Sequence, residues 1–323
     1  MNQLDLYTRI YYHLKNYGMP TWVMGVPRFV LRKIAYRFLP KYLSESRINT
    51  GNKAEDLIVS FTSFPARINN VWQVVECMLR QTLLPSKIIL WLSKDQFPNR
   101  EAIPVSLLSR EGEIFEIRMV DGDIRSHKKY LYVCREYSDS TVMLIDDDIL
   151  YPSNLVEQMY CTFKREKGKV ICNWGNIIMY NADGTPLPYK EWKIEYDYTE
   201  NADFFFGSGG GLMFQPSRLY KDLTNIELAL KIVPLADDIW LNAMVRLAGV
   251  GIVKLKSGLV LPVQSGENNT NLADSNLNQG GNDKQLMALN NYYLNTIGIE
   301  PFSVKCIKKY EKDSNAISLR SFV

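Results

Sequence analysis

The stretch VMLIDDDILYP, residues 142–152, decides the fold and marks where its site lies. Its first four residues, 142–145, are apolar and typical of a strand buried on both faces, so the three aspartates that follow must emerge at the end of the strand. Three adjacent carboxylates repel one another, because like charges and desolvation both raise a carboxyl pKa. The pattern therefore predicts a compensating divalent cation.

Alternating strands and helices surround this stretch. Strands are expected at 56–64, 87–93, 115–123 and 141–148, with a helix at 69–82. Strands separated by helices imply parallel pairing, hence an α/β fold with a mostly parallel, Rossmann-like open sheet flanked by helices. Ligands of such sheets bind beyond the carboxyl ends of the strands. The four strand ends are polar: Thr62 and Ser63, Ser93 and Asp95, Asp121 and Asp123, and the aspartate triplet.

Composition excludes several classes of protein. The 323 residues are 46% hydrophobic and 23% charged, which is ordinary for a globular chain. A net charge of only +3 argues against a nucleic-acid partner. The five cysteines form no CxxC pair and there are two histidines, which is typical of reduced structural cysteines and argues against a zinc site.

A basic, aromatic segment begins the chain, and we divide the sequence into this arm (1–52), a main domain (53–300) and a tail (301–323). Residues 1–50 hold eight Lys and Arg against two acids, a net charge of +6. They are expected to form short helices that contact the inner leaflet of a membrane, or else a helix pair packed on the main domain with a solvated basic face. Without a signal peptide or a spanning segment, the chain is expected in the cytoplasm, peripheral to the cytoplasmic face of the inner membrane where the arm binds lipid.

Asp146 and Asp148 form an Asp-x-Asp pattern at the predicted ligand edge of the sheet. Mn²⁺ and Mg²⁺ prefer oxygen ligands, and Mg²⁺ takes one or two carboxylates while phosphates and water complete its shell. A metal that bridges to a diphosphate is therefore expected here. The alternative is a solvated acidic turn or a helix N-terminus, where aspartates are also favoured.

A second acidic pair, Asp237 and Asp238, begins an apolar helical pattern in ADDIWL, residues 236–241. One of the two carboxyls could cap that helix. A second acid beside it, distant in sequence from the triplet, fits a general base that takes a proton from an attacking hydroxyl.

Glycine and basic side chains supply further candidates for ligand contact. In GSGGG, residues 207–211, the dinucleotide-binding spacing fails, so Gly209 and Gly210 are expected to let the backbone approach a bulky ligand. Arg67 follows the first strand and could meet a phosphate or a base edge. Lys128 and Lys129 lie near the end of the third strand. Four aromatic side chains could stack on sugars or fill the core: Trp174, Trp192, Tyr196 and Tyr198.

Taken in order, VSFTSFPARI (59–68), SKIILWLSKDQFP (86–98), VMLIDDDILYP, ADDIWLNAMVRLAG (236–249) and, more loosely, GSGGGLMF (207–214) carry a family resemblance. The sequence resembles the nucleotide-sugar-dependent glycosyltransferases of the GT-A fold, close to family 2 and to bacterial enzymes of capsule and lipopolysaccharide assembly. The resemblance implies that Asp146 and Asp148 bind Mn²⁺ or Mg²⁺ and, through it, the diphosphate of a sugar donor, first of all a UDP-sugar. It also implies a base at Asp238, next to Asp237. Nucleotide-sugar contacts are expected at Thr62, Ser63, Arg67, Asp95, Asp121, Lys128, Asp147, Gly209 and Gly210.

The resemblance also implies a reaction. Asp238 takes the proton of an acceptor hydroxyl on a glycan or glycolipid, which attacks the anomeric carbon and inverts it. One departure is that such enzymes often add a late His as a metal ligand, whereas this chain has no His after His127. Asn282, Asp283 or water could take that place.

Three other functions remain open on the sequence. A glycoside hydrolase needs two carboxylates and no metal, but three consecutive aspartates suit it poorly. A nucleotidyltransferase usually has a glycine-rich basic loop after its first strand, and TSFPAR, residues 62–67, is not one. A glycan-binding protein on a transferase fold would have no need of the acids at both sites.

Overall fold

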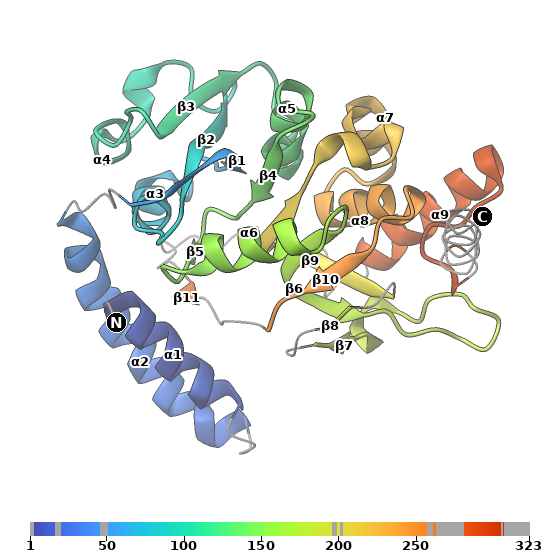
Figure 1. Cartoon of the computed structure of the whole chain (residues 1–323), viewed down its shortest axis with the longest axis horizontal. Coiled ribbons are helices and arrows are strands. Elements are labelled where there is room, and N and C mark those ends of the chain that lie inside the picture. The colour runs from blue at the N-terminus through green and yellow to red at the C-terminus, as the bar shows by residue number, and fades with distance from the viewer. Residues whose placement is uncertain are drawn as a thin grey trace.

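The computed structural model describes residues 3–16, 21–45, 51–195, 199–200, 203–256, 261–262, 281–304 and 306. Its centre is an open, mostly parallel sheet flanked by helices (Figure 1), which confirms the predicted fold class. Of the aromatic residues singled out above, Tyr196 and Tyr198 lie outside the described residues.

The described part of the main sheet has nine strands in the order β3-β2-β1-β4-β9-β6-β10-β8, with β7 paired to β6. Pairing is parallel between β3, β2, β1 and β4 and between β6 and β10, and antiparallel at β4–β9, β9–β6, β6–β7 and β10–β8. A small second sheet joins β5 to β11. The strands are β1 (Lys53–Thr62), β2 (Leu84–Ser93), β3 (Phe115–Val120), β4 (Thr141–Leu144), β5 (Ile149–Leu150), β6 (Val170–Ile177), β7 (Lys193–Ile194), β8 (Thr199–Glu200), β9 (Phe204–Phe214), β10 (Ile252–Lys254) and β11 (Leu261–Pro262).

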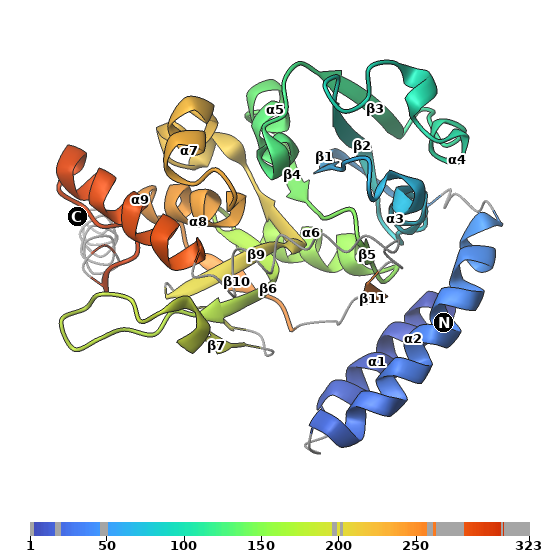
Figure 2. The same ribbon diagram turned by 180° about the vertical axis from the view of Figure 1, so that it is seen from behind.

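Helices cover both faces of the sheet, as Figure 1 and, from behind, Figure 2 show. They are α1 (Gln3–Asn16), α2 (Thr21–Ser44), α3 (Val71–Leu79), α4 (Val105–Leu108), α5 (Lys128–Glu136), α6 (Leu155–Arg165), α7 (Ile226–Ile232), α8 (Asp237–Leu247) and α9 (Gly281–Ile297). Strand residues alternate between two hydrophobic clusters. Leu57 and Val59 of β1 belong to the cluster that contains residues of α3 and α6, whereas Ile58 belongs to the cluster that contains residues of α5, α8 and α9. The period-two pattern of a doubly buried strand thus produces three layers.

The glycine-rich segment forms part of β9, an antiparallel strand between β4 and β6. The sequence predicts a close approach to a ligand there, but the close approaches that the structure shows are to protein side chains. A Cβ at Gly209 would overlap the carboxylate of Asp146, and one at Gly210 would overlap the indole of Trp174. These glycines therefore make room for neighbours within the sheet.

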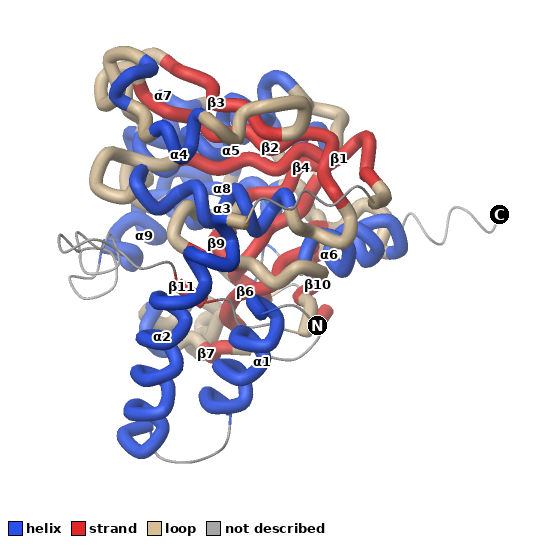
Figure 3. The backbone as a smooth tube through the Cα atoms, turned by 90° about the vertical axis from the view of Figure 1, so that its left-hand side faces the viewer, coloured by secondary structure: helices blue, strands red, loops and turns tan. Residues whose placement is uncertain are grey.

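The chain begins with a helical hairpin, α1 and α2, that extends from the body (Figure 1 and, turned by 90°, Figure 3). Asp5 accepts hydrogen bonds from the backbone N–H and the hydroxyl of Ser153, at 2.9 and 2.6 Å. Arg80 of the body donates to the carbonyls of Tyr42, Leu43 and Glu45. No helix among the described residues is both long and apolar enough to cross a membrane.

Candidate active site

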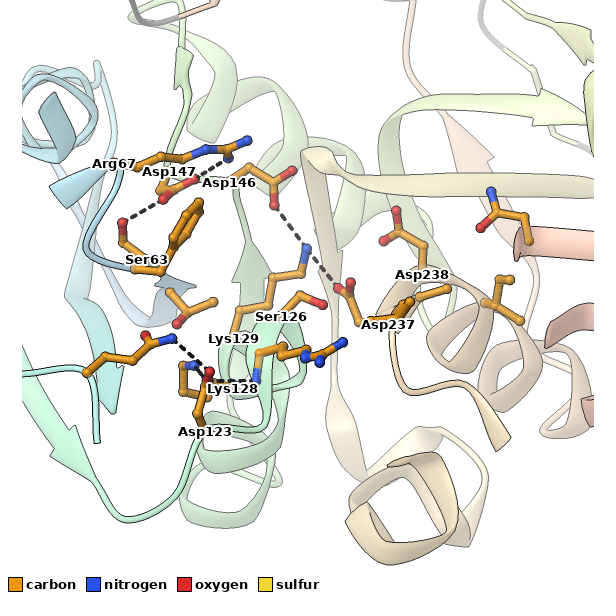
Figure 4. A pocket seen from close by; sticks show the side chains of 18 of the residues that line it. Ser63, Arg67, Asp123, Ser126, Lys128, Lys129, Asp146, Asp147, Asp237 and Asp238 are labelled. Atoms are coloured by element: carbon orange, nitrogen blue, oxygen red, sulfur yellow. Dashed lines mark hydrogen bonds and ion pairs between the residues drawn. The ribbon is translucent and has the colours of Figure 1, made fainter. Parts of the chain in front are cut away.

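A pocket of about 590 Å³ opens at the carboxyl ends of the parallel strands, where the fold predicts a ligand. Figure 4 shows its polar side chains converging from the ends of β1 and β4 and from the starts of α5 and α8. The pocket is lined by Thr62, Ser63, Phe64, Arg67, Gln96, Asp123, Arg125, Ser126, Lys128, Lys129, Asp146, Asp147, Tyr189, Phe205, Leu235, Ala236, Asp237, Asp238, Ile239 and Asn282.

The first wall of the pocket is built on Asp147, the middle residue of the triplet. Its buried carboxylate accepts hydrogen bonds from the Ser63 hydroxyl at 2.6 Å and from Arg67 Nη1 at 2.8 Å. Arg67 Nη1 also lies 2.9 Å from Asp148 Oδ2. Burial raises the pKa of Asp147, although Arg67 opposes that rise. Asp147 thus fixes the loop after β1, and with it Arg67, against the end of β4.

Lys129 connects the two acidic groups that the sequence predicts separately. Its buried Nζ lies 2.9 Å from Asp146 Oδ1 and 2.8 Å from Asp237 Oδ2, as Figure 4 shows. Burial alone would lower the pKa of Lys129, but Asp146, Asp237 and Asp238 raise it well above its usual value. Burial would likewise raise the pKa of Asp237, but Lys129 and His127 lower it. Lys129 is therefore a charged bridge across the pocket.

Asp238 is held differently from Asp237, although both begin α8. Ser208 of β9 donates to Asp238 Oδ1 from its backbone N–H at 3.0 Å and from its hydroxyl. Burial, followed by the neighbouring charge of Asp237, raises the pKa of Asp238 to about 6. A carboxylate of that pKa is ionised at neutral pH and is a stronger proton acceptor than an ordinary Asp.

The backbone around Asp146 is fixed by a tyrosine. The Asp146 N–H donates to Tyr151 Oη at 2.9 Å, and that hydroxyl donates to the Gly209 carbonyl at 2.5 Å. Because Gly209 has no side chain, the carboxylate of Asp146 lies directly against β9. Asp146 is thus positioned by β4, β9 and Lys129 together.

The residues fit the divalent cation that the sequence predicts. Burial, and next the charge of Asp146, raises the pKa of Asp148 to about 6, while the charge of Arg67 opposes that rise. The donor set is hard carboxylate oxygen, as Mg²⁺ and Mn²⁺ require. In the described chain no three or more His, Cys, Asp or Glu side chains gather into a metal site. A cation at Asp146 and Asp148 would therefore take its other ligands from a bound molecule and water.

The other predicted residues divide into those that line the pocket and those that do not. Thr62, Ser63, Arg67 and Lys128 line it. Thr62 donates to the Trp91 carbonyl at 2.8 Å, and Lys128 pairs with Asp123. Predicted residues outside the lining are Asp95, Asp121, Asp148, Gly209 and Gly210.

At the ends of β2 and β3, neighbours of the predicted residues face the pocket instead. Asp95 and Asp121 are exposed, and Asp121 pairs with Lys94 at 2.8 Å. Gln96 and Asp123 line the pocket, and Gln96 Nε2 donates to Asp123 Oδ2 at 2.7 Å. The predicted strand ends correctly indicate the edge of the sheet at which the pocket opens. A shift of one or two residues along the chain decides which side chain points into the pocket.

Sequence reasoning missed two kinds of residue. Ser208, which donates hydrogen bonds to Asp238, lies inside GSGGG, where the glycines were interpreted and the serine was not. Arg125 lines the pocket with a φ of 55°, in the left-handed region that non-glycine residues rarely adopt. Its backbone N–H donates to Asp123 Oδ1 at 2.9 Å, and Asp-Gly-Asp at residues 121–123 is the turn signal that could have indicated this loop.

Two predicted aromatic groups belong to the core. Trp192 is buried in a cluster with Tyr189 and Phe205, at ring-centroid distances of 4.7 and 5.1 Å. Trp174 packs over Gly210. Tyr189 and Phe205 line the pocket, so aromatic surface is present there. Asn282 also lines it, while Asp283 accepts a hydrogen bond from the Tyr189 N–H at 2.8 Å.

Comparisons with known proteins give no family. No family model matches the sequence, and no curated protein matches it. Among solved structures, a CMP-2-keto-3-deoxy-manno-octonic acid synthetase in complex with CTP aligns with 67% of this chain and 93% of its own, at 10% identity and a TM-score of 0.41. HddC from Yersinia pseudotuberculosis aligns with 50% of this chain and 77% of its own, at 10% identity and a TM-score of 0.32.

Proposed function

We propose that the protein transfers a sugar from a nucleoside diphosphate donor, in the first instance a UDP-sugar, to a hydroxyl of a surface glycan carried on a membrane lipid. The observation that carries the proposal is one pocket in which Asp146 and Asp238 both lie, joined through Lys129 and Asp237. Transfer to a hydroxyl needs charge compensation at the leaving group and a base at the attacking group. Asp146, at one end of this group of residues, is placed for charge compensation, and Asp238, at the other end, is placed to act as the base.

The donor end is proposed at the ends of β1 and β4. Asp146 and Asp148 would hold Mn²⁺ or Mg²⁺, which supplies compensation for the charge that grows on a departing diphosphate. Arg67, beside Asp147 and Asp148, and Lys128, beside Asp123, both line the pocket and would bring positive charge toward the phosphates. Thr62 and Ser63 place polar groups where the nucleoside would enter.

The acceptor end is proposed at Asp238. Its carboxylate takes the proton from the acceptor hydroxyl while that oxygen forms a bond to the anomeric carbon of the donor sugar. The bond between that carbon and the diphosphate oxygen breaks, and the nucleoside diphosphate leaves with the electron pair. Attack opposite the leaving group inverts the anomeric centre.

Asp237 acts on Asp238 rather than on the acceptor. Lys129 and His127 lower the pKa of Asp237 against the effect of burial, so Asp237 stays ionised. After burial, its fixed negative charge is the next cause of the raised pKa of Asp238. Asp237 and Lys129 therefore tune the base to near-neutral pH, which is where a general base works best.

The first test is turnover of the donor. With wild type, a UDP-sugar and Mn²⁺, we expect release of UDP, and Asp238→Asn should reduce that rate by about 10²–10⁴-fold, the usual contribution of a general base. The amide can still accept both hydrogen bonds from Ser208, so donor binding should persist. Asp56→Asn, a matched change on β1 outside the pocket lining, should leave turnover unchanged. Wild-type turnover in Asp238→Asn would contradict the role of Asp238.

A further inference from the structure

The hairpin of α1 and α2 is fixed to the body at one end and is open along one side. Leu31, Ala35, Leu39 and Leu43 recur at every fourth position of α2 and are buried. Ala35, Leu39 and Leu43 belong to the core cluster that also contains Leu4 of α1. Figure 1 and Figure 3 show that the end of α1 and the start of α2 lie at the end of the hairpin far from the sheet. One face of α2 is therefore fully used in packing.

Beside that buried face runs an exposed apolar stripe, which consists of Val26, Val30, Ile34 and Phe38. Their exposed fractions are 67%, 47%, 40% and 55%. The fourth-residue spacing places them in one line along α2, and at 1.5 Å per residue the line is about 18 Å long. On α1, Leu6 and Ile10 are also exposed. An apolar stripe of this length on a surface helix indicates a binding surface.

A basic stripe lies next to the apolar stripe, one position earlier along the helix. It consists of Lys33, Arg37 and Lys41, all exposed. Lys33 Nζ lies 5.5 Å from the centroid of the Phe29 ring, so an exposed aromatic begins the same line. Helix α2 has five Lys and Arg and no Asp or Glu. The helix thus presents apolar side chains and positive charge side by side.

The positive charge of the basic stripe indicates which kind of partner binds the two stripes. A second copy of the chain would bring the same basic stripe against this one, and like charges would repel at the rim of the contact. An anionic lipid surface accepts both stripes together, because the apolar side chains enter the boundary of the acyl chains while Lys and Arg meet the head groups. The charge complementarity therefore favours a lipid surface.

We propose that the apolar and basic stripes of α2 dock the protein onto the surface of an anionic bilayer. The hairpin lies on the membrane and does not cross it. Docking does not depend on the transferase proposal, since none of these side chains lines the pocket. If both proposals hold, the pocket works beside the surface that carries a lipid-linked acceptor.

The test is binding of the full chain to vesicles. Wild type should sediment with vesicles of phosphatidylcholine and phosphatidylglycerol, more weakly with phosphatidylcholine alone, and less at high salt. Removing the apolar contact with Ile34→Ser/Phe38→Ser should weaken binding to the anionic vesicles by about tenfold or more. Removing two charges with Lys33→Gln/Arg37→Gln should weaken it by about tenfold or more as well.

A matched control changes apolar side chains that are at least as exposed and lie on other elements. Val105→Ser/Met287→Ser alters α4 and α9, at exposed fractions of 78% and 65%, and should bind vesicles like wild type. All three double variants should keep the melting temperature and the response to nucleotide, since the changed side chains lie outside the core and the pocket. Equal binding of wild type to both kinds of vesicle, or wild-type binding by the stripe variants, would overturn the proposal. So would a wild-type dimer that Ile34→Ser/Phe38→Ser converts to a monomer without any vesicle binding.

Discussion

The three adjacent aspartates of the triplet have three different environments. Asp146 pairs with Lys129. Asp147 is hydrogen-bonded to Ser63 and pairs with Arg67, and Asp148 pairs with the same Arg67. The sequence correctly indicates that adjacent carboxylates need compensation. It did not assign Arg67 and Lys129 as the partners, because those contacts depend on how the loop after β1 and the start of α5 are placed in space.

At the residue scale, Asp238 should make stability depend on pH. Its pKa is raised from an ordinary 3.8 to about 6 by burial and by Asp237, while Lys129 opposes and Asp146 adds to the rise. The folded protein therefore binds the Asp238 proton more tightly than the unfolded chain does, so stability falls as pH rises from about 4 to about 6 and stays lower above that.

Asp238→Asn removes this loss, since the amide stays neutral at every pH. Its melting temperature should match wild type near pH 4 and exceed it at pH 7.5, by an amount that corresponds to roughly 1–3 kcal/mol of unfolding free energy. Glu101→Gln, which changes an exposed carboxyl, serves as the control and should show no such trend. Equal melting temperatures of Asp238→Asn and wild type from pH 4 to 7.5 would show that the pKa of Asp238 is not raised in the folded protein.

At the scale of elements, β9 is the part of the site that sequence reasoning interpreted least well. Four glycines in five residues, Gly207 and Gly209 to Gly211, do not resemble a strand, because glycine packs no side chain in a sheet. Their effect depends on neighbours from other segments: Asp146, Trp174 and Met159 occupy the space where Cβ atoms would lie. The parallel strands, by contrast, were predictable from their continuous apolar runs.

Gly209→Ala should therefore act through Asp146. The new methyl group would overlap the Asp146 carboxylate and push it away from β9, with a loss of about 1–3 kcal/mol in unfolding free energy. We also expect the metal-dependent response to nucleotide to weaken, as measured by titration calorimetry. Gly112→Ala is the matched control, because a Cβ there meets no atom within 4 Å, and it should behave like wild type. Wild-type nucleotide affinity in Gly209→Ala would exclude this role for Gly209.

For the whole molecule, the alternation of strands and helices was enough to predict an open, mostly parallel sheet flanked by helices and the edge at which the pocket opens. The arrangement that brings Asp238 of α8 into one pocket with Asp146 was not predictable. The two residues are joined through Lys129 and Asp237, and β9 lies next to β4 in the sheet and contacts α8. Basic and aromatic composition predicted a helical arm. The structure adds which line of side chains on that arm is left uncovered.

The most direct test of the central claim is a thermal-shift measurement of UDP, GDP, CDP and dTDP, each with and without Mn²⁺. A ligand that binds the folded state alone, at about 100 times its Kd, adds roughly 2.7 kcal/mol of stability. We expect one nucleotide to raise the melting temperature of wild type in a metal-dependent way, and Asp148→Ala to abolish that shift. Asp139→Ala, at the opposite end of β4, should retain it. No shift with any nucleotide, or the same shift in Asp148→Ala, would contradict a metal-bound diphosphate at the aspartate triplet.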